Sequence, residues 1–316
     1  MTGSSCMRWN LFFLLGLTSS ISVVAAEQTW LIMGTKTVIR GPDCLSPAER
    51  ETTQIQAIQV LQETERRYST WTSGSELARL NLSRDPTRAP HPLVQELEKV
   101  MKLSSQWEGA FHPGLGRWVL ASGIRSNPPP APSKIGKRLK ELGKPPQFAE
   151  KDSIADLLKN PDWIFEEGGF AKGLALDLIP LPKTPCGIEI NLGGQILHRG
   201  PHPTRVQIAS PINRSKPWIE LTVQNESVAT SSQSENPGHL IDPRTGLPSR
   251  NRGSATAIHP SALEADIAAT AIAILGPKAP ARLDWIYLEP SGHAYAPRRL
   301  QNRIKSLVPL HWHWIE

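Results

Sequence analysis

The sequence predicts an α+β fold that is rich in antiparallel sheet. In the second half of the chain, short strand patterns follow one another with Gly/Pro turns and few helices between them, which favours antiparallel pairing. Amphipathic helical patterns lie mainly in the first half, and one apolar helix with clear start and stop signals follows most of the strands. The predicted strands of the second half are 187–192, 205–209, 218–223, 228–230, 240–242 and 255–259.

The first half of the chain predicts one strand and four helices. Residues 29–39 read as a strand that contains Met33-Gly34-Thr35. A helix follows Ser46-Pro47 and extends to about Arg67, because proline is favoured at the first helical position. A short helix is expected over 76–81 and an amphipathic one over 93–107. A proline-rich connector, 127–132, then precedes a basic helix over 133–142.

The N-terminal 26 residues predict a secretory signal. Arg8 precedes an apolar run over 11–24, and Val24-Ala25-Ala26 offers a small-residue cleavage site. The run is short and interrupted by hydroxyl residues, which favours cleavage over a retained membrane anchor. The mature chain would then be a single domain over 27–316, located in the periplasm or secreted.

Two cysteines, Cys44 and Cys186, remain after removal of the signal, in a compartment that permits disulfides. The sequence does not decide whether they pair, because pairing requires Cα atoms that lie close together. The formal net charge is +6, without a long basic stripe and without interleaved basic and aromatic residues. This composition argues against nucleic-acid binding and suits an anionic small ligand.

The helix predicted over 261–275 carries the most informative residues. Ser261 followed by Glu264 is the pattern of a capping box, and Gly276-Pro277 ends the helix. Asp266 is the one carboxylate within its apolar run, and Thr270 lies one turn later on the same face. A buried carboxylate must be paired with a cation, so Asp266 either meets a buried Arg or Lys or, with Thr270, offers oxygen ligands to Mg²⁺.

Three further segments could bind a phosphate-bearing ligand. The run Glu-Glu-Gly-Gly-Phe-Ala-Lys-Gly at 166–173 leads into a helix over 174–179, where backbone N–H groups and Lys172 would attract an anion; an ordinary glycine turn is the alternative. Hydroxyl groups follow an apolar strand at 230–234, where they could bind phosphate or ribose; a solvated turn is the alternative. The turn at 239–246 groups His239, Asp242 and Arg244, and His239 is either a general base or an ordinary hydrogen-bonded histidine.

The C-terminal residues 311–314 alternate His and Trp. A strand period of two places both histidines on one face and both tryptophans on the other. This pattern predicts a sheet edge that covers the core rather than a metal site.

Taken together, the motifs resemble those of the FAD:protein FMN transferase family (ApbE-like flavin transferases). The resemblance extends from Met33-Gly34-Thr35 to Leu275-Gly276. The matching segments are 69–70 with 75–81, 168–173, 191–194, 229–231, 239–246 and 265–266 with 269–270. Each motif is weak alone, whereas the set in this order is specific.

The resemblance implies an antiparallel-sheet-rich ApbE-like fold and a Mg²⁺-dependent extracytoplasmic enzyme. Such an enzyme splits FAD at its pyrophosphate and transfers FMN to a Thr or Ser of an acceptor flavoprotein, releasing AMP. The implied metal ligands are the backbone carbonyl of Ala171 and the side chains of Asp266 and Thr270. His239 would deprotonate the acceptor hydroxyl. Contact with a membrane is expected only through an uncleaved signal or through the acceptor.

The same resemblance implies a set of FAD-contacting residues. They are Met33, Trp71, Asn81, Glu166, Lys172, Thr230 and Asp242. Where the family usually has the acids of Phe-Asp-Pro-Thr and Asn-Leu-Gly-Gly-Asp, this chain has His112 and Gln195. These departures leave open the alternative that the protein is a flavin-binding relative of these enzymes, either non-catalytic or hydrolysing FAD.

Overall fold

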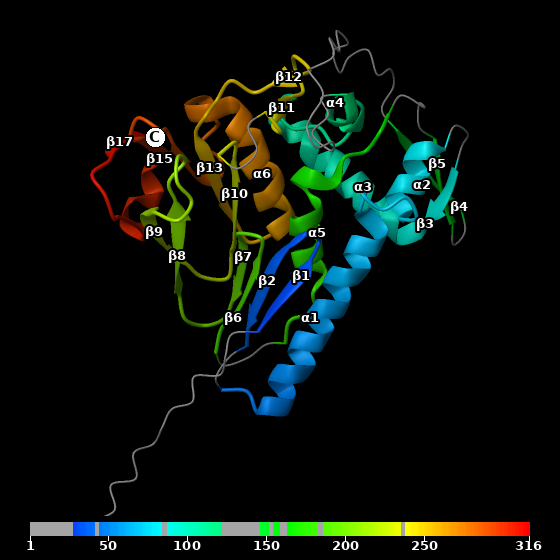
Figure 1. Ribbon diagram of the computed structural model, residues 1–316, viewed down its shortest axis with the longest axis horizontal. Coiled ribbons are helices and arrows are strands. Elements are labelled where there is room, and N and C mark those ends of the chain that lie inside the picture. The colour runs from blue at the N-terminus through cyan, green and yellow to red at the C-terminus, as the bar shows by residue number, and fades with distance from the viewer. Residues whose placement is uncertain are drawn as a thin grey trace, which may run out of the picture.

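The computed structural model describes residues 28–316 except 42–43, 84–86, 122–145, 152–153, 159–162, 183–185 and 235–237 (Figure 1). The expected signal segment and the expected basic helix over 133–142 lie outside the described residues. Among the helices that are described, none is both long and apolar enough to cross a membrane.

A nine-stranded sheet forms the centre of the protein, in the order β1-β2-β6-β7-β10-β13-β14-β15-β17. Neighbouring strands are antiparallel except β15 and β17, which are parallel. The antiparallel-rich prediction is therefore confirmed. The strands are β1 (Thr29–Ile32), β2 (Thr35–Arg40), β6 (Ile188–Leu192), β7 (Gln195–Arg199), β10 (Ser227–Ser232), β13 (Ser254–His259), β14 (Asp284–Leu288), β15 (His293–Pro297) and β17 (His311–Ile315).

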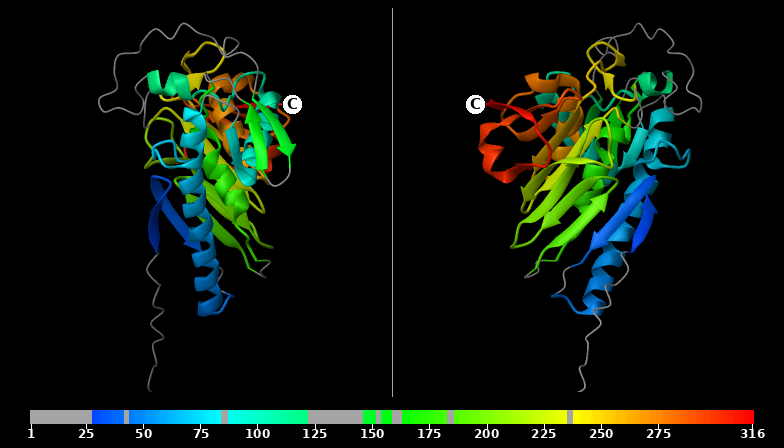
Figure 2. Two further views of the ribbon diagram at one scale, coloured as in Figure 1. Left: turned by 90° about the vertical axis from the view of Figure 1, so that its right-hand side faces the viewer. Right: turned by 60° about the vertical axis from the view of Figure 1, so that its left-hand side comes forward.

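Smaller sheets and the helices surround this centre. The smaller sheets are β16 (Ile304–Ser306) with β9 (Pro217–Val223) and β8 (Thr204–Ala209), β3 (Thr87–Pro90) with β5 (Ile154–Leu158) and β4 (Gln147–Lys151), and β11 (Ile241–Asp242) with β12 (Leu247–Pro248). The α-helices are α1 (Pro47–Tyr68), α2 (Glu76–Leu82), α3 (His91–Ser104), α4 (Gly116–Ala121), α5 (Ala171–Leu178) and α6 (Ala262–Leu275). Figure 2 shows α1 running alongside β1 and β2.

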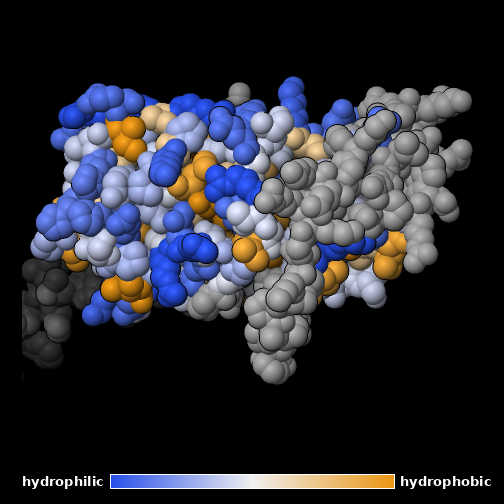
Figure 3. All heavy atoms as spheres, turned by 90° about the horizontal axis from the view of Figure 1, so that it is seen from above, coloured by the Kyte–Doolittle hydropathy of each residue, from blue (hydrophilic) through white to orange (hydrophobic). Residues whose placement is uncertain are grey.

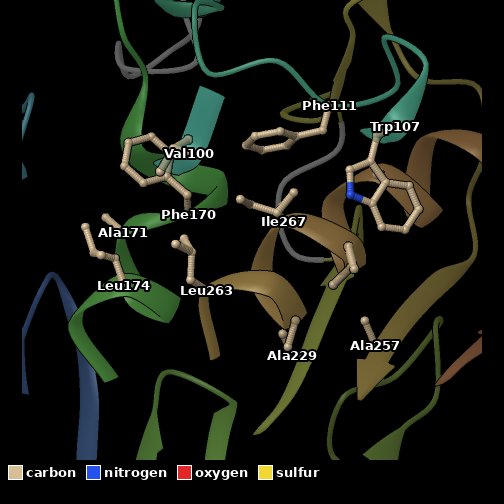
Figure 4. Packing of buried hydrophobic residues seen from close by; sticks show 14 of the residues in the cluster. Val100, Trp107, Phe111, Phe170, Ala171, Leu174, Ala229, Ala257, Leu263 and Ile267 are labelled. Atoms are coloured by element: carbon tan, nitrogen blue, oxygen red, sulfur yellow. The ribbon is translucent and has the colours of Figure 1, made fainter. Parts of the chain in front are cut away.

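The central sheet is covered on both faces where β10 and β13 lie. Val228 and Ile258 pack into a core shared with β8 and β9. Their neighbours Ala229 and Ala257 face the opposite way and pack against α6. Because successive strand residues point to opposite faces, both strands are buried on both sides. Figure 4 shows Ala229, Ala257 and α6 residues such as Ile267 in this core.

The segment 29–39 forms a hairpin, so the expectation of one continuous strand was wrong. Met33 and Gly34 have positive φ values of 54° and 67°, and they turn the chain between β1 and β2. Two consecutive residues with positive φ match the twist of a two-residue hairpin. Met33 therefore has a role in the turn and packs at the junction of two apolar clusters.

Helices α5 and α6 are joined at two points. At the first point, the backbone N–H of Gly173 donates to Asp266 Oδ2 at 3.0 Å. At the second, Asp177 accepts hydrogen bonds from Ser261 Oγ at 2.6 Å and from the backbone N–H of Ala262 at 2.7 Å. A carboxylate at a helix N-terminus satisfies backbone donors that lack a partner in the helix. These bonds fix α6 relative to α5.

Cys44 and Cys186 form a disulfide, with Cα atoms 6.2 Å apart and a sequence separation of 142. It links the segment before α1 to the segment before β6. We expect the Cys44→Ser/Cys186→Ser double variant to lose about 3 kcal/mol of unfolding free energy, because a long loop is released in the unfolded chain. Urea unfolding checks this loss. The addition of a reductant should destabilise the wild type and leave the double variant unchanged; equal unfolding midpoints for the two proteins would refute the prediction.

Candidate active site

A pocket with a volume of about 440 Å³ lies where α5 and α6 meet the β6–β7 turn and strand β10. It brings together six of the residues singled out from the sequence. They are Glu166, Lys172, Thr230, His239, Asp266 and Thr270. These residues are distant in the sequence, and they meet because α6 packs on β10 while α5 packs on α6.

Asp266 is a buried carboxylate that reaches this pocket. Only 5% of the residue is exposed, and one oxygen accepts the Gly173 N–H within the first turn of α5. Among the described residues, no Lys or Arg forms an ion pair with it. The alternative of a buried ion pair is therefore not supported in the described part of the chain. The carboxylate has the N-terminus of α5 as its favourable electrostatic partner.

Thr270 lies one helical turn after Asp266 and also lines the pocket. Its Oγ1 is 3.3 Å from the Oγ of Ser231 on β10. Gly169 passes so close that a Cβ there would lie 3.2 Å from the same hydroxyl. The glycine thus leaves space between Thr270 and the turn that precedes α5.

The oxygen atoms of Asp266 and Thr270 fit a hard divalent cation such as Mg²⁺. In the described residues, no group of three His, Cys, Asp or Glu side chains is placed to hold a metal ion. A cation at this position would therefore complete its shell with hydroxyl, carbonyl, water or phosphate oxygens, which is the mode Mg²⁺ prefers. Ala171, whose carbonyl is the third expected ligand, is buried as the first residue of α5, next to the pocket-lining Lys172.

Hydroxyl groups on β10 form one wall. Thr230 and Ser231 line the pocket, and Thr230 Oγ1 lies 2.8 Å from Thr256 Oγ1 on the adjacent strand β13. His239 lines the pocket just before β11. A histidine, a lysine and several hydroxyls thus face the same space as the Asp266 carboxylate. Such a set can bind an anion and move a proton.

Four expected FAD-contacting residues do not line this pocket: Met33, Trp71, Asn81 and Asp242. The Asn81 amide binds the backbone N–H and carbonyl of Phe165 at 2.8 and 2.9 Å. The Asp242 carboxylate accepts hydrogen bonds from the Arg244 guanidinium at 2.8 and 2.9 Å. Trp71 is 68% exposed. Met33 forms part of the β1–β2 turn, and the side chains of Asn81 and Asp242 are engaged in hydrogen bonds within the protein.

The departures from the family motifs fall at two different kinds of position. Gln195 is buried outside the pocket wall and donates to the carbonyl of Ala262 at 2.8 Å, so it supports the first turn of α6. Glu167, which follows the pocket-lining Glu166 and is separate from the departures at His112 and Gln195, is also buried and accepts hydrogen bonds from the backbone and side chain of Thr70 at 2.9 and 2.5 Å. His112, in contrast, lines the pocket itself.

Sequence reasoning did not place His112 in the site. Its ring packs on Trp163 with centroids 4.8 Å apart, and its Nδ1 accepts the N–H of Gly114 at 3.0 Å. Gly114 permits this packing, because a Cβ there would lie within 3.0 Å of both rings. Burial lowers the pKa of His112 from 6.5 to about 4, so the imidazole is neutral near pH 7.

The low pKa of His112 predicts a loss of stability in mild acid. The unfolded chain binds a proton below about pH 6.5, whereas the folded chain resists it down to about pH 4. The contribution of the neutral His112 to the unfolding free energy is therefore complete above pH 6.5. It decreases by about 2–3 kcal/mol as the pH falls through this range. Urea unfolding at several pH values checks this. The slope of the unfolding free energy against pH should be smaller for His112→Gln than for the wild type. His202→Gln, at an exposed histidine, is the control; equal slopes for all three proteins would contradict the prediction.

Solved structures with this fold include proteins named flavin transferases. The flavinyl transferase ApbE of Pseudomonas stutzeri, in its apo form, superposes with a TM-score of 0.70 at 19% identity, covering 89% of this chain and 97% of that one. The apbe protein of Thermotoga maritima superposes with a TM-score of 0.75 at 20% identity, covering 88% and 98%.

The sequence model of the ApbE family matches residues 33–287, and the chain belongs to this family. A Vibrio cholerae relative named FAD:protein FMN transferase is 26% identical over 277 residues, which cover 79% of this chain and 82% of the relative. A Rhodobacter capsulatus relative of the same name is 29% identical over 201 residues, 58% of this chain. This match spans only 38% of that longer relative.

Proposed function

We propose that this protein is a Mg²⁺-dependent FAD:protein FMN transferase that acts outside the cytoplasm. It would transfer FMN from FAD to a Thr or Ser hydroxyl of an acceptor flavoprotein and release AMP. The observation that carries the proposal is the hydrogen bond between the Gly173 N–H and Asp266. This bond holds the buried carboxylate and Thr270 beside Lys172, at the N-terminus of α5, where a pyrophosphate group would be attracted.

Four side chains of the pocket and one backbone carbonyl have roles in the proposed reaction. Asp266 and Thr270, with the Ala171 carbonyl, would hold Mg²⁺, and Lys172 would neutralise a phosphate oxygen. The bound cation would supply charge stabilisation at the pyrophosphate. His239 would take the proton of the acceptor hydroxyl, because a neutral hydroxyl is a poor nucleophile. The acceptor oxygen then bonds to the FMN phosphorus, and the bond from that phosphorus to AMP breaks.

Extracytoplasmic location is proposed from two features. The first 26 residues have the pattern of a secretory signal. In addition, the Cys44–Cys186 disulfide is of a kind that persists in oxidising compartments. Separation of periplasmic and cytoplasmic fractions tests the location, and a protein found only in the cytoplasm would refute it.

The activity is tested by incubation of the mature protein with FAD, Mg²⁺ and an acceptor flavoprotein that carries a target Thr. A fluorescent flavin band on the denatured acceptor, with an equal amount of AMP, would support the proposal. An acceptor whose target Thr is replaced by Val is the control and should remain unlabelled. AMP without labelled acceptor would instead indicate FAD hydrolysis, and FAD binding without turnover would indicate a non-catalytic relative.

A further inference from the structure

The pocket has two chemically different walls. The apolar wall comes from the segment around α4 and the segment around β11. It consists of Phe111, Leu115, Val119, Leu240 and Ile241. The polar wall comes from the β6–β7 turn and from β8 with the connection to β9. Its polar residues and glycines are Asn191, Gly193, Gly194, Gln207 and Arg214, and the neighbouring strand residues Ile196, Ile208 and Ala209 complete the lining on this side. A dinucleotide with one large apolar ring system and one more polar half matches this division.

Arg214 is the charged residue of the polar wall, and it lies over a glycine turn. Its Nη2 would be 3.4 Å from a Cβ placed on Gly194, an ordinary contact distance, so the guanidinium lies directly against this turn. The turn itself is held by the hydrogen bond from the Gly194 N–H to Asn191 Oδ1 at 2.9 Å and by that from the Gly193 N–H to the Lys36 carbonyl at 2.9 Å. Arg214 therefore rests on a fixed platform.

The connection that carries Arg214 is also ordered by its own hydrogen bonds. The Ser210 N–H donates to the Lys216 carbonyl at 2.9 Å, and the Lys216 N–H donates to the Asn213 carbonyl at 3.0 Å. The side chain of Asn213 in addition accepts the N–H and the hydroxyl of Ser215 at 3.1 and 2.7 Å. Little loop entropy is then lost when the guanidinium meets a ligand.

We propose that Arg214 is a substrate-binding residue that recognises the adenosine-phosphate half of the dinucleotide, an inference that rests on the proposed function. A guanidinium presents several N–H donors in a planar fork, which matches the oxygens of a phosphate. The isoalloxazine ring system would occupy the apolar wall, and the pyrophosphate would lie between the walls, next to Lys172 and Asp266. Nothing in the local sequence around Arg214 marks it, because the fold alone brings it to the pocket.

Calorimetric titration of the mature protein with FAD, FMN and ADP, in the presence of Mg²⁺, tests this assignment. Arg214→Ala should weaken FAD and ADP binding about tenfold or more and change FMN binding less than about twofold. Arg214→Lys should recover only part of the loss, because it keeps the charge without the fork. Lys216→Ala is the matched control, since it removes one positive charge from the same exposed connection outside the pocket wall.

The outcomes separate the two proposals. Wild-type protein that binds neither FAD nor ADP overturns the proposed function. Wild-type protein that binds both, with Arg214→Ala unchanged, overturns the role of Arg214 alone. An equal loss of FMN and ADP affinity in Arg214→Ala overturns the assignment to the adenosine half. A loss of the same size in Lys216→Ala means that only the net charge matters, which also overturns the proposal.

Discussion

Replacement of Asp266 by asparagine is expected to reduce FMN transfer about a hundredfold or more without unfolding the protein. The amide oxygen can still accept the Gly173 N–H, so the change in unfolding free energy of the metal-free protein should stay below about 1 kcal/mol. The loss of charge, however, removes the anionic oxygen ligand for Mg²⁺. Initial rates, together with thermal unfolding with and without Mg²⁺, measure the two effects separately.

Two variants of the same helix serve as controls for Asp266→Asn. Thr270→Val removes one neutral ligand and should lower the rate less, by about tenfold. Glu264→Gln changes a carboxylate in the first turn of α6, where its partner is His259 at 3.5 Å, and should leave the rate unchanged. If Asp266→Asn unfolds the protein and the wild type shows no response to Mg²⁺, Asp266 has a purely structural role.

Replacement of Gly173 by alanine should produce the largest loss of stability, about 4 kcal/mol. The new Cβ would lie 2.3 Å from the carbonyl oxygen of Ala262 and 2.8 Å from the Cβ of Asp266. Both contacts are with rigid parts of α6, so relief requires the two helices to separate, and the cost exceeds that of ordinary overpacking. Separation would also break the Gly173–Asp266 hydrogen bond and weaken Mg²⁺ binding.

Urea unfolding and Mg²⁺ titration of the same samples test this prediction. Gly74→Ala is the control, because nothing lies within 4 Å of its Cβ position and its φ is not positive. It should change the unfolding free energy by less than about 0.5 kcal/mol. A Gly173→Ala protein with wild-type stability and wild-type Mg²⁺ affinity would show that the close contact between α5 and α6 is not required.

Helices α1 and α6 could be predicted well because their ends carry local chemical signals. Ser46 and Glu49 form a capping box with Pro47 at the expected start of α1, and Ser261 accepts the Glu264 N–H at the start of α6. The alternating pattern of β17 was equally informative. Trp312 and Trp314 stack 4.7 Å apart on one face, and the strand forms an edge of the central sheet, as predicted.

The strand β14 was not predicted, because burial on both faces removes the alternation that identifies a strand. Residues 285–288 are all buried, so the run Trp-Ile-Tyr-Leu has no polar face. The Met33-Gly34 turn was missed for a different reason. Methionine seldom has a positive φ, so nothing in its chemistry announces a reversal of the chain there.

The candidate site could be predicted in part. Asp266 stood out because a carboxylate in an apolar helix needs a physical explanation, and Thr270 followed from helical spacing. Motif membership alone was less informative, since Asn81 and Asp242 are engaged in hydrogen bonds within the protein. His112 and Arg214 reach the pocket through tertiary packing. The surface seen from above mixes hydrophilic and hydrophobic residues in small groups, without a pattern that singles out one region (Figure 3).

The alanine-lined contact between α6 and the strands β10 and β13 has a consequence for how this protein can diverge. Ala265, Ala268 and Ala269 are completely buried, and Ala229 and Ala257 are nearly so. Any larger residue there would push the helix outward and carry Asp266 and Thr270 with it. Evolutionary change in ligand preference is therefore expected in the strand ends and loops that supply the other walls, while the oxygen pair on the helix stays where it is.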